Sequence, residues 1–195
     1  MTTTAALPGF TDAVHDAQAA FRGVLEAMAH PGHIVTVPGP KAGPAGLDPA
    51  TASLLLTLCD GDTPVWLDPA AAAIADWLAF RTGASRAAAS ADAAFAVVLA
   101  PQAMPPLRDF DWGTDEVPEA STTLIVQVKA LDEAEGWVLR GPGIATQARL
   151  SVAGLPERWA ADRRAMQAAF PRGVDVVFTC GHRIAALPRT TIVES

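Results

Sequence analysis

The change from alternating helices and strands to consecutive strands is the feature that most restricts what this chain can fold into. Helical periodicity and short apolar runs alternate through the first half, at 12–29, 33–37, 49–59, 64–67, 69–80 and 94–99. Later, apolar runs follow one another at 122–128, 137–140, 149–152, 174–178 and 184–187, interrupted by one helix that starts at Pro156. Alternation is typical of α/β folds, and direct succession is typical of antiparallel pairing. We therefore predict an α/β fold with three αβα layers and a mixed sheet.

Two Asp-Pro dipeptides predict where helices begin. Asp48-Pro49 and Asp68-Pro69 each combine an N-cap carboxylate with a proline at the first helical position, where the missing N–H costs nothing. The second of these helices should end near Phe80, because Gly83 is a suitable C-cap.

Other stretches are expected to be irregular or polar. They are the loop 38–47, an acidic excursion over 100–121 with at most a short helix, and a polar turn from Asp132 to Gly136 that joins two strands. The helix from Pro156 should place Trp159, Met166 and Phe170 along one stripe, with Arg158, Asp162, Arg163 and Arg164 mostly on the other face.

The C-terminal segment Phe170–Thr191 predicts a hairpin with an arginine at each end. Gly181 separates two apolar runs and can adopt the positive φ of a tight turn. Arg172 and Arg189 each lie beside a proline, so each presents a forked cation on stiff backbone, which suits an anion-binding surface. The simpler interpretation is that both are solvated turn residues.

Length and composition restrict the class of protein. The chain is long enough for one sizeable core, so we expect a single domain over 1–195, with 1–9 as a flexible N-terminus. The net charge of −7 argues against nucleic acid as a partner. No basic leader and no run of about 18 apolar residues is present, which predicts a cytoplasmic protein without a membrane segment. Cys59 and Cys180 should be reduced core residues.

Metal and cofactor sites are not favoured by the spacing of candidate ligands. His30 and His33 are separated by Pro31-Gly32, which excludes helical convergence on a metal, and the acidic residues between 109 and 116 lack the oxygen spacing of a calcium loop. Lys41 and Lys129 lie in a loop and at a strand end, where neither is held for a Schiff base. We therefore predict no metal and no cofactor.

The Gly141-Pro142-Gly143 segment directly follows a strand and can expose backbone N–H groups to an anion, with Arg140 beside it. It is not a Walker loop, because both the spacing and the Lys-Ser/Thr ending differ.

The chain carries a series of different short motifs whose order and spacing together identify a family. They are Gly9-Phe10, Gln18, Phe21-Arg22, Ala27-Met28-Ala29-His30-Pro31-Gly32, Leu56-Thr57-Leu58 with Asp60, Thr63-Pro64-Val65-Trp66-Leu67, Thr82-Gly83, Leu139 to Ile144, Phe170-Pro171-Arg172-Gly173-Val174-Asp175 and Leu187-Pro188-Arg189-Thr190-Thr191. From about Gly9 to Val193 the chain thereby resembles the PhnH family of the bacterial carbon–phosphorus lyase core complex. The family often has Phe-His-Thr-Gly where this chain has Phe80-Arg81-Thr82-Gly83, so a role for that histidine does not carry over.

The resemblance implies a fold similar to the large domain of pyridoxal-phosphate-dependent transferases, without the cofactor. It also implies a homodimer when isolated, and assembly with the G, I and J subunits of the core complex. In that system a phosphonate displaces adenine from ATP to give a ribose phosphonate triphosphate, and the I subunit is the usual candidate for the catalyst. Ligand or interface candidates are Arg22, His30, Thr82, Arg140, Gly141, Gly143, Arg172, Asp175, Arg189 and Thr190.

Two classes of function stay open at this point. One is a non-catalytic assembly subunit, and the other is a subunit that lends arginines to an anionic phosphonate or nucleotide ligand at a shared site. A stand-alone transferase that uses pyridoxal phosphate is a remote third interpretation. The sequence identifies neither the phosphonate, nor the docking surface, nor the dimer axis.

Overall fold

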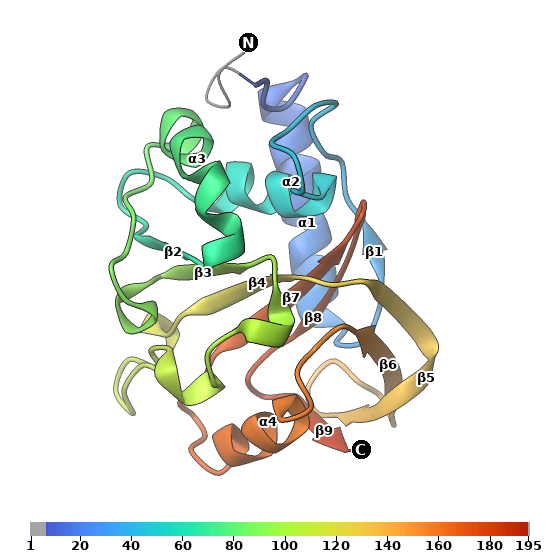
Figure 1. Ribbon diagram of the computed structural model, residues 1–195. Coiled ribbons are helices and arrows are strands. Elements are labelled where there is room, and N and C mark those ends of the chain that lie inside the picture. The colour runs from blue at the N-terminus through green and yellow to red at the C-terminus, as the bar shows by residue number, and fades with distance from the viewer. Residues whose placement is uncertain (1–6, 195) are drawn as a thin grey trace.

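The computed structural model describes residues 7–194 (Figure 1). Its helices are α1 (Ala13–Ala29), α2 (Pro49–Leu58), α3 (Ala75–Thr82) and α4 (Trp159–Gln167). Its strands are β1 (Val35–Thr36), β2 (Val65–Leu67), β3 (Phe95–Val98), β4 (Thr123–Gln127), β5 (Ala130–Arg140), β6 (Ala148–Ala153), β7 (Asp175–Cys180), β8 (Arg183–Leu187) and β9 (Ile192–Glu194). Short 3₁₀ helices are η2 (Pro69–Ile74), η3 (Ser90–Asp92), η4 (Pro101–Ala103), η5 (Leu107–Asp109) and η6 (Pro118–Ala120).

A six-stranded sheet with the order β1-β8-β7-β4-β3-β2 forms the centre of the molecule. Strands β2, β3, β4 and β7 pair in parallel, whereas β8 pairs antiparallel with both β7 and β1. The predicted α/β class and mixed sheet are therefore confirmed. A smaller antiparallel sheet, β6-β5-β9, lies beside it, and its third strand β9 was not predicted.

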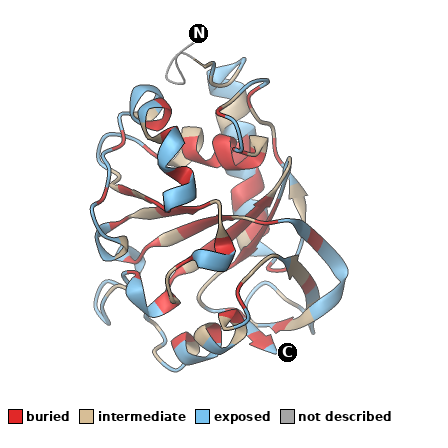
Figure 2. Ribbon diagram, in the orientation of Figure 1, coloured by how far each residue is buried: buried red, intermediate tan, exposed pale blue. Residues whose placement is uncertain are grey.

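Alternate residues of the central strands point to opposite faces and build two cores. On β4, Ile125 belongs to the core under α1, α2 and α3, whereas Leu124 and Val126 belong to the core on the other face. That second core is covered by α4, by the 3₁₀ turns of 100–121 and by the small sheet (Figures 1 and 2). The expected αβα layering therefore holds on one face, and the other face is only partly helical.

Both Asp-Pro dipeptides mark helix starts, but their carboxylates have different partners. Asp68 Oδ1 accepts from the backbone N of Ala71 at 2.7 Å, and the chain then runs as the 3₁₀ helix η2 before α3 begins. Asp48 makes no cap bond within α2, and its Oδ2 accepts instead from the N–H of Gly181 at 2.7 Å. Gly83 ends α3 with φ of 75°, as predicted.

The predicted turn from Asp132 to Gly136 is wrong, because β5 continues through this polar stretch as one strand. The register with β6 shifts between Asp132 and Trp137, so residues 133–136 have no partner on β6, and Gly136, with φ of 99°, lies against the β6 backbone. The last helix is also shorter than its pattern indicates, so Phe170 lies beyond it and is exposed. The excursion 100–121 contains one-turn 3₁₀ helices that bury Met104, Leu107 and Phe110.

Of the predicted flexible N-terminus, residues 1–6 lie outside the described residues. The carbonyl of Leu7 accepts from Arg81 Nε and Nη2 at 3.0 and 2.6 Å. Between residues 7 and 194, no helix combines the length and the apolar composition that a bilayer crossing requires.

Candidate functional site

Open α/β sheets bind ligands beyond the carboxyl ends of their parallel strands, and polar side chains of this chain occupy that edge. Asp68, only 2% exposed, follows β2 and accepts from the backbone N–H groups of Leu99 and Ala100 at 3.0 and 2.8 Å. At the end of β4, Gln127 Oε1 accepts from the backbone N–H of Asp48 at 2.8 Å. These N–H groups are bonded internally, so they are not available to an external anion.

Arg189 lies inside the molecule and braces three segments. Its Nε and Nη2 lie 3.3 and 2.6 Å from the two carboxylate oxygens of Asp175, and its Nη1 donates to the carbonyl of Pro118. Both side chains of the pair are only 15% exposed. The guanidinium thus joins the start of β7, the turn after β8 and η6.

Arg172 has a different environment, although the sequence pairs it with Arg189. Its Nε lies 3.1 Å from Asp115 Oδ1, and the two side chains are 45% and 73% exposed. Both arginines contact the acidic excursion, but at different points and with very different access to solvent. An exposed pair of this kind contributes little to stability.

Arg163 was expected on the face of the last helix that does not carry Trp159 and Met166, and this prediction is wrong, because all three residues are buried. The side chain is completely buried, and its Nη1 and Nη2 donate to carbonyls near the end of the chain, namely those of Val174 (3.2 Å), Leu187 (3.4 Å), Thr191 (3.4 Å) and Pro188. Buried carbonyl groups that have no hydrogen-bond partner in a helix or sheet need another donor, and one guanidinium has several N–H donors. Burial lowers the pKa of Arg163 to about 10, while nearby Asp175 raises it and Arg189 lowers it, so the group stays charged at neutral pH.

Glycines bring three of the sequence motifs into direct backbone contact. A Cβ on Gly143, whose φ is 80°, would lie 2.0 Å from the carbonyl O of Ala29, at the end of α1. A Cβ on Gly141, whose φ is 136°, would lie 3.0 Å from the carbonyl O of Thr190. In the turn after α1, Gly32 packs against the side chain of Leu139 on β5. The 141–143 loop is therefore clamped between the turn after α1 and the turn after β8.

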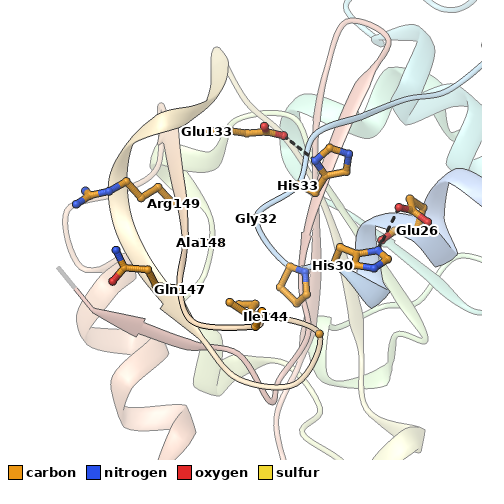
Figure 3. Close-up of a pocket in the computed structure, with 12 residues that line it drawn as sticks. Glu26, His30, Gly32, His33, Glu133, Ile144, Gln147, Ala148 and Arg149 are labelled. Atoms are coloured by element: carbon orange, nitrogen blue, oxygen red, sulfur yellow. Dashed lines mark hydrogen bonds and ion pairs between the residues drawn. The ribbon is translucent and has the colours of Figure 1, made fainter.

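An open cleft of about 500 Å³ lies where the 30–33 turn faces the β5–β6 hairpin (Figure 3). Each of its two histidines is paired through Nδ1, His30 with Glu26 at 3.1 Å and His33 with Glu133 at 3.2 Å. All four side chains are about half exposed. Glu133 also accepts from the backbone N–H of Ile34, so it links the turn to the small sheet.

The lining of this cleft continues along the other wall, where Ala148 packs towards Gly32 and Figure 3 shows the Gln147 and Arg149 side chains directed away from the two imidazoles. It is made by Gly143, Ile144, Ala145, Gln147, Ala148 and Arg149. We take this as the candidate site, because it combines a concave surface of ligand size with two of the predicted site residues, His30 and Gly143. Neither histidine pairing was predicted. Glu133 lies far from His33 in sequence, whereas Glu26 lies one helical turn before His30, a spacing that the sequence shows.

Comparison with known proteins decides the family. The family model described as bacterial phosphonate metabolism protein (PhnH) matches residues 8–194. The chain belongs to the PhnH family. It is 41% identical over 191 residues to the alpha-D-ribose 1-methylphosphonate 5-triphosphate synthase subunit PhnH of Rhizobium meliloti (strain 1021), covering 95% of this chain and 94% of the relative. It is also 35% identical over 182 residues to the putative C-P lyase subunit protein HtxG of Stutzerimonas stutzeri, covering 91% and 85%.

The other candidate residues from the PhnH motifs either lie away from the cleft or have side chains that hydrogen-bond to the backbone. Thr82 donates to the carbonyl of Leu78 and accepts from the N–H of Ala84, so it closes the end of α3. Arg140 is exposed and contacts Glu194 at 3.4 Å. The remaining two, Arg22 on α1 and Thr190 after β8, are exposed.

The lysines and cysteines of this PhnH-family chain complete the set of reactive groups. Lys41 and Lys129 are both exposed. Cys59 is buried, and burial followed by the charge of Asp60 raises the pKa of its thiol to about 12, whereas Cys180 is only partly buried. In the part of the chain that the structure describes, no three His, Cys, Asp or Glu side chains are grouped so as to hold a metal ion.

Proposed function

We propose that this protein is an accessory, non-catalytic subunit of the carbon–phosphorus lyase core complex. In that role it supports formation of ribose 1-methylphosphonate 5-triphosphate from ATP and a phosphonate, in the cytoplasm, together with the G, I and J subunits. The observation that carries the proposal is the nearly end-to-end match to relatives that are themselves named as a synthase subunit and a C-P lyase subunit.

The internal use of its polar groups supports a role without chemistry of its own. Asp68 and Gln127 occupy the edge of the sheet where a ligand of an α/β protein usually binds, and Arg163 and Arg189 donate to carbonyls and a carboxylate of this chain. We further propose that residues 1–195 form one domain similar to the large domain of pyridoxal-phosphate-dependent transferases, without its cofactor. The exposure of both lysines argues against the alternative of a transferase with a Schiff base.

The isolated chain is proposed to be a homodimer that uses the exposed face of α1. Val14, Phe21 and Leu25 recur at a spacing that places them on one stripe, and they are 76%, 46% and 52% exposed. Large apolar side chains grouped in this way indicate an interaction surface. Light scattering should give a dimer mass for the wild-type chain and a monomer mass for Phe21→Ser. The control is Phe80→Ser on α3, which removes another exposed phenylalanine and should remain dimeric.

Co-expression with the G, I and J subunits tests the main proposal. The chain should co-purify with them, and a strain without it should not grow on methylphosphonate as sole phosphorus source. Growth of the deletion strain would refute the proposal, and so would a core complex that purifies complete and active without this chain.

A further inference from the structure

The cleft between the 30–33 turn and the β5–β6 hairpin has a use beyond assembly. We propose that it binds a small anion that carries a phosphoryl or phosphonyl group, and that binding takes up protons on His30 and His33. The inference rests on the proposed function only in the choice of methylphosphonate among its probes, since the chemistry of the cleft selects the class of anion.

The backbone of the 141–147 loop supplies donors on one wall. Among hydrogen bonds between described residues, Ile144 N donates to Gly141 O at 3.2 Å, whereas the N–H groups of Gly143, Ala145 and Gln147 donate to no protein acceptor. Unpaired N–H groups in a glycine-containing loop form the type of concave surface that binds anions. They lie on a cleft large enough for a phosphorylated metabolite, at about 500 Å³.

The two histidines on the facing wall determine when an anion is accepted. In both rings Nδ1 is directed at a glutamate, so Nε2 is the remaining polar atom. In a neutral ring whose Nδ1–H donates to the carboxylate, Nε2 carries a lone pair and repels an anion. After protonation the same atom donates, and imidazoles make this change near neutral pH.

Charge counting across the whole cleft leads to the same conclusion. The charged groups that line it are Glu26, Glu133 and Arg149, whose guanidinium points away from the imidazoles in Figure 3, and with neutral imidazoles the formal sum of the three is −1. Protonation of both rings changes that sum to +1, so an anion is favoured only together with protons. A cation site is not indicated, because each glutamate is already paired with an imidazole.

Isothermal titration of the purified full-length chain tests the inference. The probes are sulfate, orthophosphate and methylphosphonate, and sulfate keeps its charge between pH 6 and pH 8, so that its pH dependence reports the protein alone. We expect sulfate to bind at least about 10-fold more tightly at about pH 6 than at about pH 8, since protonation of the two rings adds two positive charges and two donors to the cleft. Tighter binding of methylphosphonate than of orthophosphate would identify a phosphonate as the source of the anion, and the reverse order would identify a phosphate.

Matched variants assign the effect to the cleft. His30→Gln and His33→Gln should each weaken binding at pH 6 several-fold and flatten the pH dependence. His15→Gln is the control, because His15 is a histidine paired with a carboxylate, Asp12, at the other end of α1. Glu133→Gln keeps the oxygen that accepts from Ile34 but removes a negative charge, so it should strengthen binding at pH 8.

A sulfate affinity that does not change with pH would overturn the inference, and so would wild-type binding by the double variant of both cleft histidines. Failure of all three anions to bind at millimolar concentration would also overturn it. In each of these cases co-purification with the core subunits still decides the proposed function separately.

Discussion

Replacing each of the two proline-adjacent arginines by lysine should have very different consequences. Lysine keeps the positive charge but loses the planar fork that contacts two acceptors at once. Arg189 uses three N–H groups, two on Asp175 and one on the carbonyl of Pro118, at a site only 15% exposed. Arg172 has one exposed carboxylate partner, Asp115.

The magnitude follows from the number of bonds lost. A hydrogen bond to a charged group contributes about 1.5–3 kcal/mol, and an ammonium at position 189 can keep one of the three, so about 3–6 kcal/mol is the upper limit. The longest of the three, at 3.3 Å, is the weakest, and water can reach part of the site. We therefore expect Arg189→Lys to lower the free energy of unfolding by about 2–4 kcal/mol, and Arg172→Lys by about 0.5 kcal/mol or less.

Urea unfolding followed by circular dichroism measures both values. With a slope of about 2 kcal/mol per M, the midpoint should fall by about 1–2 M for Arg189→Lys and by less than about 0.3 M for Arg172→Lys. Equal shifts in the two variants would refute the assignment of Arg189 as an internal brace. An unshifted Arg189→Lys variant would do the same.

Three further predictions concern groups that the structure places internally. Arg163→Met leaves several buried carbonyls without a donor and should lower the free energy of unfolding by at least about 3 kcal/mol, seen as a melting temperature lower by roughly 6 °C or more. Gly143→Ala should cost about 2–4 kcal/mol in urea unfolding because its Cβ would lie 2.0 Å from a carbonyl oxygen, whereas Gly43→Ala, with no atom within 4 Å, should stay within about 0.5 kcal/mol. Iodoacetamide at about pH 8 should label Cys180 but not Cys59, whose buried thiol has a pKa of about 12 and stays neutral, and labelling of both should appear only in urea.

Local signals predicted the fold wherever the deciding interactions are local. The Asp-Pro dipeptides at 48 and 68 and the glycine at 83 gave helix limits that the structure keeps, because prolines, the Asp68 cap and the Gly83 C-cap act within one turn of chain, although the expected cap by Asp48 is not formed. The turn expected between Asp132 and Gly136 failed because its polar composition reflects an exposed strand segment. What keeps β5 one strand is the pairing of its residues on both sides of this segment, Asp132 and Trp137, with β6, which lies further along the chain.

Arg163 shows why helical periodicity alone does not locate buried charge. A pattern of four charged residues on the last helix favours a solvated face, and nothing local distinguishes one of the four. Arg163 is buried because carbonyls of residues 174–191 accept from it, and these carbonyls lie next to α4 only once β7, β8 and β9 have folded against that helix. A sequence argument that finds this residue must first place those strands.

The candidate cleft was visible in the sequence only as separate pieces. The His30–His33 turn and the Gly141–Gly143 loop were each identified, and the anion-binding capacity of the loop was inferred from its glycines and its place after a strand. What the sequence lacks is the contact that joins them. Gly143 has room for no side chain because the end of α1 lies against it. The glycine therefore has two roles: it adopts the positive φ of the turn, and it lets two segments that are distant in sequence come into contact. The same contact fixes the wall of the cleft opposite the imidazoles. Substitution of Gly143 should therefore disturb anion binding and stability together, whereas substitution of His30 should disturb binding alone.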